Sequence, residues 1–414
     1  MLSAEIIAVG SELLTPERSD TNSLWITERL NEIGIDVMLK TIVGDDEVRL
    51  TEAIKDAFKR SDIVITTGGL GPTEDDITRQ VAAKALGRET EYRDDIEVLL
   101  RERFRLWGRE MPEINKRQAY VIAGSEVLPN PNGSAVGMML EDGGKTLVVL
   151  PGPPRENQPM FDGFVMPRLS EKTGDVVVRR RILKVSGMGE SAVDEAAAPI
   201  YMQYPTVRTA VLFNRTEVEI HLYSRAATAP EAKAVLDELA PKIAEKLGIA
   251  VFSLDGESME EVVGRLLRSA GKTLALAESC TGGLIGRRVT DVAGSSEYFL
   301  EGFVTYSNEA KMRTLGVPKD VLQKHGAVSA ETAEAMALGA RRISGADVAV
   351  SVTGIAGPGG GSEEKPVGTA FVGYSDADAV RSIKLTLPGD RYLVRWRASQ
   401  AALDMIRRQL LITK

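Results

Sequence analysis

The sequence predicts a multi-domain α/β protein. With 414 residues, the chain is long enough for two to three domains of about 100–200 residues each. Short apolar runs alternate with helical segments over residues 1–170 and again over 258–414, as is typical of α/β domains. Between them, residues 175–253 combine a hairpin pattern with a long amphipathic helix. That segment predicts a small α+β module.

The composition excludes several classes of protein. The chain is 43% hydrophobic and 27% charged, which is ordinary for a globular protein. No apolar run approaches the ~18 residues that a membrane span needs. A single cysteine, Cys280, excludes an internal disulfide framework and predicts a cytoplasmic location. The net charge of −8 argues against broad nucleic-acid binding. With only His221 and His325 present, any hydrolysis would need a base other than histidine.

In the first domain, strands and helices alternate from the start. Apolar strands are predicted at 6–9, 37–43 and 62–66, with helices over 24–33 and 50–58. Strict alternation of this kind favours a mostly parallel, doubly wound sheet that is covered by helices on both faces.

A glycine-rich loop follows the third of these strands. Gly68, Gly69 and Gly71 allow a ligand to approach the backbone at the edge where parallel sheets bind ligands. The acidic residues 74–76 follow at once, and carboxylates there suit a hard cation that bridges phosphate oxygens. The alternative is that these acids only occupy the favourable first turn of a helix.

The middle segment has a different pattern. Residues 207–213 and 217–223 alternate apolar and polar side chains, as in a half-exposed hairpin, and an amphipathic helix follows over 231–247. The arginines at 179–181 and the Gly-x-x-Gly-like loop at 187–190 are also found in RNA-binding modules. However, the segment lacks interleaved aromatic residues and belongs to an acidic chain. We therefore expect a spacer that also forms a dimer.

The chemistry of the last domain centres on the heptapeptide 277–283 (AESCTGG). It follows an apolar strand over 273–277 and precedes a helix that starts at 284. Backbone N–H groups at such a junction suit an anion or a developing oxyanion. Ser279 lies where a nucleophile would be exposed. The alternative is that Ser279 and Thr281 simply cap the helix.

The rest of this domain continues the alternation of strands and helices. A β-branched and aromatic strand precedes a helix capped near Ser307, and a second helix begins after Ser329. The predicted strands are 298–306, 348–352 and 370–374, and the last helix is 390–412.

Amide hydrolysis needs a nucleophile, a base and donors for the oxyanion. Ser279 can supply the first, and Lys311 can be the base if its surroundings lower its pKa from about 10.4. Tyr306 can relay a proton or orient the lysine, and the loop from Gly354 offers backbone donors. The alternatives are a solvated helix lysine and a core tyrosine. Cys280 is a second candidate nucleophile, but no histidine lies nearby in sequence to lower its pKa.

Several motifs of the first domain resemble a known family. Residues 20–23 (DTNS), 67–72 (TGGLGP) and 150–154 (LPGPP), together with Asp76, resemble the molybdopterin-binding domain of molybdenum-cofactor biosynthesis proteins. In detail they are most similar to the N-terminal half of the CinA (competence/damage-inducible) family. This resemblance implies that the domain hydrolyses ADP-ribose to AMP and ribose 5-phosphate with a divalent metal ion.

The same resemblance assigns roles to residues of the first domain. Asp20 and Asp76 would contact the metal, and Asp76 and Asn22 would contact the substrate. The cradle of the ligand would be formed by Gly68, Gly69 and Gly71.

The last domain carries a more specific resemblance. Residues 277–283, 306–311 (YSNEAK), 326–329 (GAVS) and 354–358 (GIAGP) resemble the C-terminal half of the CinA family, which is similar to the stand-alone nicotinamide-nucleotide amidase. This implies deamidation of nicotinamide mononucleotide to nicotinate mononucleotide and ammonia, without a cofactor. The nucleophile, the base and the assisting residue would be Ser279, Lys311 and Tyr306.

The resemblance also implies the substrate contacts and the assembly. Thr281 and Thr353 would hold the phosphate or ribose, Gly282 and Gly283 would contact the substrate, and Gly354 would help at the oxyanion. The middle module would be KH-like, and the protein a homodimer that binds small nucleotides and no membrane. Two other functions stay open: a molybdopterin-handling protein, and an interaction protein of DNA uptake or damage response with one active site or none.

Overall fold

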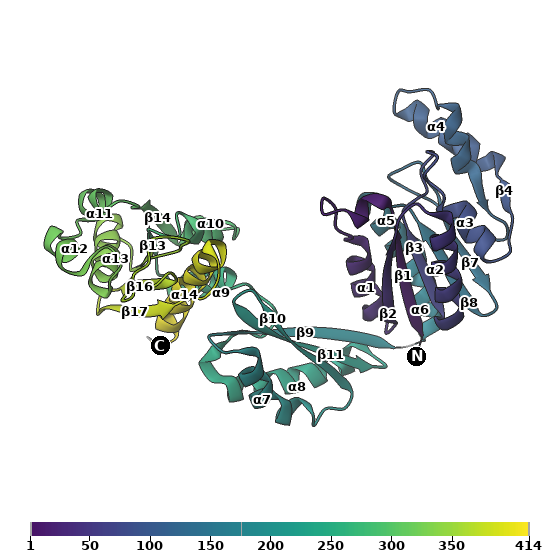
Figure 1. Ribbon diagram of the computed structural model, residues 1–414. Coiled ribbons are helices and arrows are strands. Elements are labelled where there is room, and N and C mark those ends of the chain that lie inside the picture. The colour runs from purple at the N-terminus through teal and green to yellow at the C-terminus, as the bar shows by residue number, and fades with distance from the viewer. Residues whose placement is uncertain (1, 175, 413–414) are drawn as a thin grey trace. The chain divides into compact units, whose positions relative to one another are not determined.

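The computed structural model describes residues 2–174 and 176–412, which form two compact units (Figure 1). One unit comprises the described residues up to Arg179 together with Ser224–Ala234, and the other comprises Arg180–Tyr223 and the described residues from Val235 onward. The predicted domain limits at residues 1, 175 and 414 lie outside the described residues. None of the described helices has the length and apolar composition needed to cross a membrane.

The first domain is built on a six-stranded sheet in the order β2-β1-β3-β8-β7-β6. β2, β1, β3 and β8 run parallel, and β7 and β6 are antiparallel additions at one edge. The predicted mostly parallel sheet is therefore confirmed. A separate pair, β4 and β5, lies outside this sheet. The strands are β1 (Ser3–Val9), β2 (Asp36–Val43), β3 (Ile63–Thr67), β4 (Thr90–Tyr92), β5 (Tyr120–Ile122), β6 (Glu126–Leu128), β7 (Gly137–Asp142) and β8 (Lys145–Leu150).

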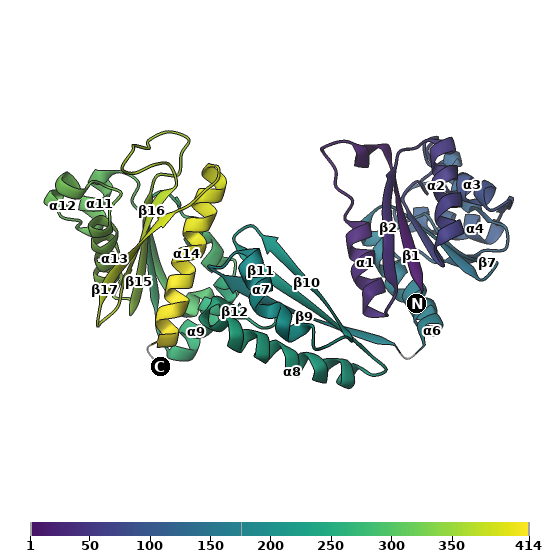
Figure 2. The same cartoon turned by 60° about the horizontal axis from the view of Figure 1, so that its bottom comes forward.

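Helices cover both faces of this sheet (Figure 2). Successive residues of a strand point to opposite faces, so Ile6 joins a core with Leu30 of α1, whereas Ile7 joins a second core with Ile54 of α2. The predicted doubly wound arrangement is therefore confirmed. The helices are α1 (Asn22–Glu32), α2 (Glu47–Arg60), α3 (Thr78–Ala85), α4 (Asp94–Leu106), α5 (Pro154–Met160) and α6 (Met166–Thr173).

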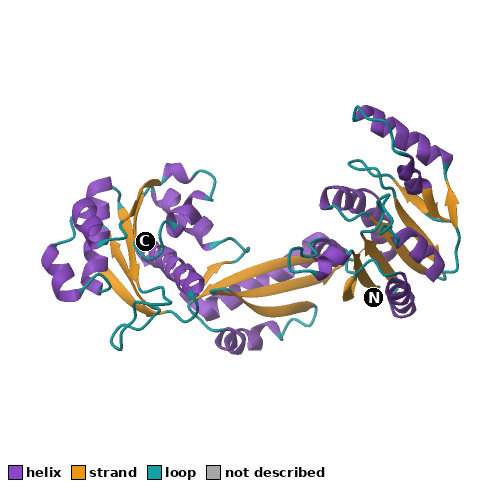
Figure 3. Cartoon of the chain, turned by 45° about the horizontal axis from the view of Figure 1, so that its top comes forward, coloured by secondary structure: helices purple, strands orange, loops and turns teal. Residues whose placement is uncertain are grey.

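The middle module is a four-stranded sheet in the order β10-β11-β9-β12, with two helices packed on it (Figure 3). Every second residue of β11 is buried from Val218 to Ser224, as the predicted half-exposed hairpin requires. Arg181 is paired with Asp237 at 2.7 Å and Asp255 at 3.1 Å, so its charge is neutralised within the protein. The elements are β9 (Val177–Ser186), α7 (Glu190–Tyr201), β10 (Val207–Asn214), β11 (Glu217–Ala226), α8 (Ala229–Leu247) and β12 (Val251–Ser253).

The C-terminal domain has a five-stranded sheet in the order β14-β13-β15-β16-β17. β14, β13 and β15 are parallel, and β16 and β17 are antiparallel. α9, α10 and α14 contribute to the core on one face, and α11, α12 and α13 to the core on the other. The elements are α9 (Met259–Ala270), β13 (Leu274–Glu278), α10 (Leu284–Thr290), β14 (Phe299–Val304), α11 (Asn308–Leu315), α12 (Lys319–His325), α13 (Ala330–Ser344), β15 (Val348–Gly354), β16 (Thr369–Ser375), β17 (Val380–Thr386) and α14 (Arg391–Ile412).

Side-chain caps fix two of the predicted helix starts in this domain. The hydroxyl of Ser307 accepts the N–H of Ala310 at 3.1 Å, which starts α11. The hydroxyl of Ser329 accepts the N–H of Thr332 at 3.2 Å, which starts α13. Each hydroxyl satisfies an N–H group that has no partner within its own helix.

Candidate active sites

The topology of the C-terminal sheet gathers the predicted amidase residues at one edge. In the parallel register, Glu278 at the end of β13 pairs with Val304 of β14 and with Val352 of β15. Ser279, directly after β13, therefore lies beside Thr353 near the end of β15. β13 lies between β14 and β15, so the strand order reverses here, and open α/β sheets bind ligands at such an edge.

Ser279 and Lys311 meet at this edge of the sheet. The Nζ atom of Lys311 lies 3.0 Å from the Oγ atom of Ser279. The same Nζ atom donates hydrogen bonds to the backbone carbonyls of Thr305 at 2.9 Å and Tyr306 at 3.3 Å. Lys311 is held there because it lies in the first turn of α11, directly after the loop that leaves β14. The alternative of a solvated helix lysine is therefore wrong.

The surroundings of Lys311 favour its neutral form. The side chain is 1% exposed, and it forms no ion pair with a carboxylate in the described part of the chain. Burial without a counter-charge lowers the pKa of Lys311 below its ordinary value of 10.5. A neutral amine has two hydrogens, which suit the two carbonyls, and one lone pair, which can accept the proton of the Ser279 hydroxyl.

A carboxylate accepts the backbone N–H groups at the strand-to-helix junction. Glu278 accepts the backbone N–H groups of Gly283 at 2.9 Å, Ile285 at 3.1 Å and Gly286 at 2.8 Å. The expectation that the start of α10 offers free donors to an anion is therefore wrong for these three groups. A carboxylate is favourable here because it faces the positive end of the helix.

Neither hydroxyl of the heptapeptide caps α10. The hydroxyl of Ser279 contacts Lys311, and the Oγ1 atom of Thr281 is buried without a hydrogen-bond partner among the described residues. The capping interpretation of Ser279 and Thr281 is therefore wrong. Cys280 is also buried, which raises the pKa of its thiol to about 11. A protonated thiol is a poor nucleophile, so the site favours Ser279 over Cys280.

Tyr306 contributes its backbone rather than its ring to the environment of the lysine. The carbonyl of Tyr306 accepts from Lys311, whereas the side chain is 61% exposed and its hydroxyl accepts from Arg391 at 3.2 Å. The alternative of a core tyrosine is therefore wrong. Arg391 also donates to the carbonyl of Gly357 at 2.8 Å, so it links Tyr306 to the glycine-rich loop.

Thr353 and Gly354 hold the remaining loops in place. The hydroxyl of Thr353 donates to the carbonyl of Ala327 at 2.6 Å, which ties the predicted 326–329 motif to the end of β15. Gly354 packs so tightly on β16 that an added Cβ would lie 2.8 Å from the Cβ of Ala370. The substrate-binding roles of Thr281, Thr353, Gly354 and Gly282 stay predictions.

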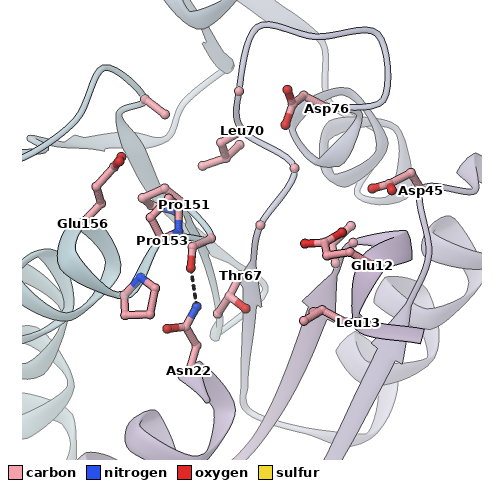
Figure 4. Close-up of a pocket in the computed structure, with 18 of the residues that line it drawn as sticks. Glu12, Leu13, Asn22, Asp45, Thr67, Leu70, Asp76, Pro151, Pro153 and Glu156 are labelled. Carbon is pink, nitrogen blue, oxygen red and sulfur yellow. Dashed lines mark hydrogen bonds between the residues drawn. The ribbon is translucent and has the colours of Figure 1, made fainter. Parts of the chain in front are cut away.

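The first domain has its own cavity at the corresponding edge of its sheet (Figure 4). Its volume is about 1050 Å³, and it is lined by the residues that follow β1, β3 and β8. Asn22 lies at its floor, where its Nδ2 atom donates to the carbonyl of Gly152 at 2.6 Å. The Oδ1 atom of Asn22 is buried and finds no partner among the described residues.

The glycines of the cavity loop are sterically required. Gly68 has φ 103°, and a Cβ there would lie 2.2 Å from the carbonyl oxygen of Val9. Gly69 has φ 66°, and a Cβ on Gly71 would lie 2.3 Å from the carboxylate of Asp76. Larger residues would therefore displace the loop from the sheet edge.

The acidic residues of the cavity fit a loosely held divalent ion. Asp76 accepts the N–H of Thr73 at 2.9 Å, and Asp20 accepts the N–H of Ser23 at 3.0 Å. No group of three or more potential metal ligands of the His, Cys, Asp and Glu type occurs within the described residues. Mg²⁺ commonly binds through one or two carboxylates together with substrate phosphates, so the donors present suit an ion that arrives with a phosphate ligand.

Comparisons with known proteins agree with this organisation. Residues 5–171 match the family described as "Probable molybdopterin binding domain", 180–253 the "Damage-inducible protein CinA KH domain" and 256–410 the "CinA C-terminal domain". A "CinA-like protein" of Solibacter usitatus is 47% identical over 409 residues, covering 99% of this chain and 98% of the relative. The chain belongs to the CinA family.

Other members of the CinA family are similar over the whole chain or part of it. A "CinA-like protein" of Koribacter versatilis is 46% identical and covers 99% of this chain and 100% of the relative. The solved structure of a competence/damage inducible protein from Agrobacterium tumefaciens is 42% identical, covers 38% of this chain and 99% of its own, and has a TM-score of 0.36. The two whole-chain relatives confirm the predicted family, and the match of residues 180–253 confirms the KH assignment of the middle module.

Two arginines of this CinA-family chain escaped the sequence analysis. Arg391 contacts Tyr306, 85 positions away, and Arg395 donates to the carbonyl of Thr281 at 2.6 Å, 114 positions away. Both lie in the first two turns of α14, one turn apart. Their position in the sequence could have revealed them. Cations at a helix N-terminus are unfavourable unless an anion or a hydrogen-bond acceptor faces them, so two arginines there indicate such a contact.

The cavity of the first domain also contains acids that the sequence analysis missed. Figure 4 shows Glu12 and Asp45 on the same side of the glycine loop as Asp76. They come from the segments that follow β1 and β2, so only the parallel sheet brings them to this edge. Arg79 is fully buried beneath the loop and donates to the carbonyl of Leu70 at 3.3 Å.

Proposed function

We propose that the C-terminal domain deamidates nicotinamide mononucleotide to nicotinate mononucleotide and ammonia. The observation that carries this proposal is the 3.0 Å contact between Ser279 and a buried Lys311 that has no counter-charge among the described carboxylates. A serine and a neutral lysine are a known solution for amide hydrolysis where histidine is absent.

The proposed reaction proceeds through an ester on Ser279. Lys311 accepts the hydroxyl proton while the Oγ atom of Ser279 bonds to the carboxamide carbon. Lys311 then returns that proton to the amide nitrogen, the C–N bond breaks, and ammonia leaves. A water molecule attacks the ester, Lys311 accepts one of its protons and returns it to Ser279, and the carboxylate product is released.

The substrate's other groups have candidate partners around Ser279. Arg391 and Arg395 supply positive charge for the phosphate, since a guanidinium binds phosphate through paired N–H donors. The unpartnered hydroxyl of Thr281 suits a ribose or phosphate oxygen. Gly354 is proposed for the oxyanion.

For the first domain, we propose hydrolysis of ADP-ribose to AMP and ribose 5-phosphate. A cavity of about 1050 Å³ lies at the upper end of the volumes of ligand sites, ~300–1,000 Å³, and suits a dinucleotide-sized ligand. Asp20 and Asp76 would hold a divalent ion, which when bound neutralises the pyrophosphate and activates water. Gly68 and Gly69 would let the phosphates approach the backbone.

A second candidate function for this cavity is molybdopterin binding, which the family description of residues 5–171 favours. Both ligands carry phosphate, so the loop chemistry alone does not separate them. Tight binding of molybdopterin without ADP-ribose turnover would select this alternative. The homodimer and the cytoplasmic location also remain predictions.

One experiment tests both proposed activities. The purified full chain is incubated separately with nicotinamide mononucleotide and with ADP-ribose, each with Mg²⁺ and with EDTA, and the products are identified by mass spectrometry. We expect ammonia release in both conditions and AMP only with Mg²⁺. Absence of ammonia would contradict the amidase, and absence of AMP with Mg²⁺ would contradict the pyrophosphatase.

A further inference from the structure

The turn between β10 and β11 of the middle module contacts α14 of the C-terminal domain. The guanidinium of Arg215 lies 5.0 Å from the ring centre of Trp396. Next to it, Gln400 donates to the carboxylate of Glu217 at 3.3 Å. The two contacts lie one helical turn apart on α14, so the hairpin follows one side of this helix.

Arg215 adopts an unfavourable backbone conformation to make this contact. Its φ is 54°, and it is the only residue other than glycine with a positive φ among the described residues. Glycine or asparagine is the usual choice at such a turn position, because a Cβ is strained there. A strained residue that places its side chain on another domain points to a role for that side chain.

Trp396 connects the hairpin to the helix that follows Ser279. Arg288 of α10 lies on the ring of Trp396 at 4.6 Å, so the ring contacts guanidinium groups from both the hairpin and α10. Arg288 is 4% exposed and donates to Ser399 at 2.8 Å and Gln400 at 2.6 Å. Cation–π contacts of this kind are stronger when they exclude water.

The same turns of α14 carry the arginines of the amidase site. Arg395 precedes Trp396 directly and donates to Thr281, and Arg391 lies one turn earlier, where it donates to Tyr306 and Gly357. The first turn of α14 contains no acidic residue, so its cations face the positive end of the helix dipole. Asp390, directly before the helix, accepts the N–H of Leu393 at 2.8 Å, and the contacts of Trp396 add support from outside the helix.

We infer that Arg215 is a positioning residue of the amidase site. By holding Trp396 against Arg288, the β10–β11 turn fixes the first two turns of α14, and thereby Arg391 and Arg395, where they meet the phosphate of the substrate. The middle module thus contributes to the function of the C-terminal site. This inference rests on the proposed amidase function and extends it to phosphate recognition.

Arg215→Gly separates this role from a purely structural one. Glycine removes the guanidinium and relieves the strain at φ 54°. We expect the melting temperature of the full chain to equal or exceed that of the wild type, while KM for nicotinamide mononucleotide rises about 5-fold and kcat changes less than about 2-fold. Arg215→Lys should restore much of the affinity, because a lysine keeps the cation–π contact.

Two controls define the mechanism. With nicotinamide riboside, which lacks the phosphate, KM should be the same for Arg215→Gly and the wild type. Arg208→Ala removes a similar contact, 5.2 Å from Tyr223 and within the middle module, and should leave both substrates unaffected. Equal KM values of Arg215→Gly and wild type for nicotinamide mononucleotide would overturn the inference.

Hydrogen exchange supplies a readout that does not depend on activity. In full-length Arg215→Gly, amides of 391–400 should exchange several-fold faster than in the wild type, while those of 401–412 stay unchanged. Unchanged exchange over 391–400 would overturn the inference even if the wild type proved inactive. A wild type that releases no ammonia would refute the proposed amidase alone, and the exchange result would still decide whether Arg215 holds α14.

Discussion

The amine of Lys311 lies 3.0 Å from the hydroxyl of Ser279, although 32 positions separate them in sequence. They meet because β13 and β14 are parallel neighbours, so the residues that follow each strand emerge at the same edge. Two backbone carbonyls accept from this amine. A buried lysine held by neutral groups alone is suited to remove a proton rather than to pair with an anion.

The pH dependence of the amidase should follow Lys311. Since burial lowers the pKa of Lys311 below 10.5, kcat should rise with pH through that lowered pKa and then level off. Lys311→Gln should reduce kcat by about 10²–10⁴-fold and abolish this rise, without unfolding the domain. Ammonia release measured from pH 5 to 10 checks this. Unchanged kinetics in a folded variant would remove the lysine from the mechanism.

Lys311 should also make the free energy of unfolding depend on pH. Between its lowered folded-state pKa and its ordinary value of 10.5, the unfolded chain binds more protons, so the free energy of unfolding should rise with pH in that window. Below the folded-state pKa the contribution is constant. Urea titrations of the wild type and Lys311→Gln should differ in this slope, and equal slopes would mean that the lysine pKa is not lowered.

Cys280 should be dispensable for catalysis. Burial raises the pKa of its thiol to about 11, so the thiolate is scarce at neutral pH. Cys280→Ala should keep kcat within about 3-fold of the wild type, and iodoacetamide should inactivate the wild type slowly. Loss of ammonia release in Cys280→Ala, with the melting temperature preserved, would instead favour a cysteine nucleophile.

Glu278 should be important for stability. Its carboxylate accepts three N–H groups at the start of α10, and an amide offers one acceptor oxygen and places N–H groups against the other donors. Glu278→Gln should therefore lower the free energy of unfolding by about 1–3 kcal/mol. Glu301→Gln, on the exposed part of β14, is the matched control. Equal stability of the two variants would contradict the capping role.

Substitution of Gly68 should impair the activity of the first domain and leave that of the C-terminal domain unchanged. A Cβ at this position would lie 2.2 Å from the Val9 carbonyl, so Gly68→Ala should displace the cavity loop and reduce ADP-ribose turnover by about 100-fold. Ammonia release should be unaffected. Gly163→Ala, where the added Cβ meets no atom within 4 Å, should leave both activities intact. An active Gly68→Ala would show that the loop does not hold the substrate.

The sequence was sufficient to predict which sheet edge gathers the candidate residues of each domain. The heptapeptide 277–283 and the glycine loop after residue 353 lie at the carboxyl ends of neighbouring parallel strands, so Ser279 and Thr353 could be placed at one edge from their local context. The doubly wound first domain followed from the same alternation of strands and helices. Local capping chemistry was sufficient to predict the helix starts at Ser307 and Ser329.

The contacts between distant segments could not be predicted in this way. Glu278 was expected to follow the strand over 273–277, whereas it is the last residue of β13, and its contact with the N–H groups of α10 depends on the path of the turn between them. Arg391 and Arg395 lie far from Ser279 in sequence and reach the site through the packing of α14. Tyr306 was placed correctly next to Lys311, but whether its ring or its carbonyl faces the lysine depends on side-chain packing.

Ammonia release from nicotinamide mononucleotide by the full chain and by Ser279→Ala tests the central claim most directly. The account predicts steady release by the wild type and no release above background by Ser279→Ala, while calorimetry shows that the variant still binds the nucleotide. Near wild-type ammonia release by Ser279→Ala would contradict it.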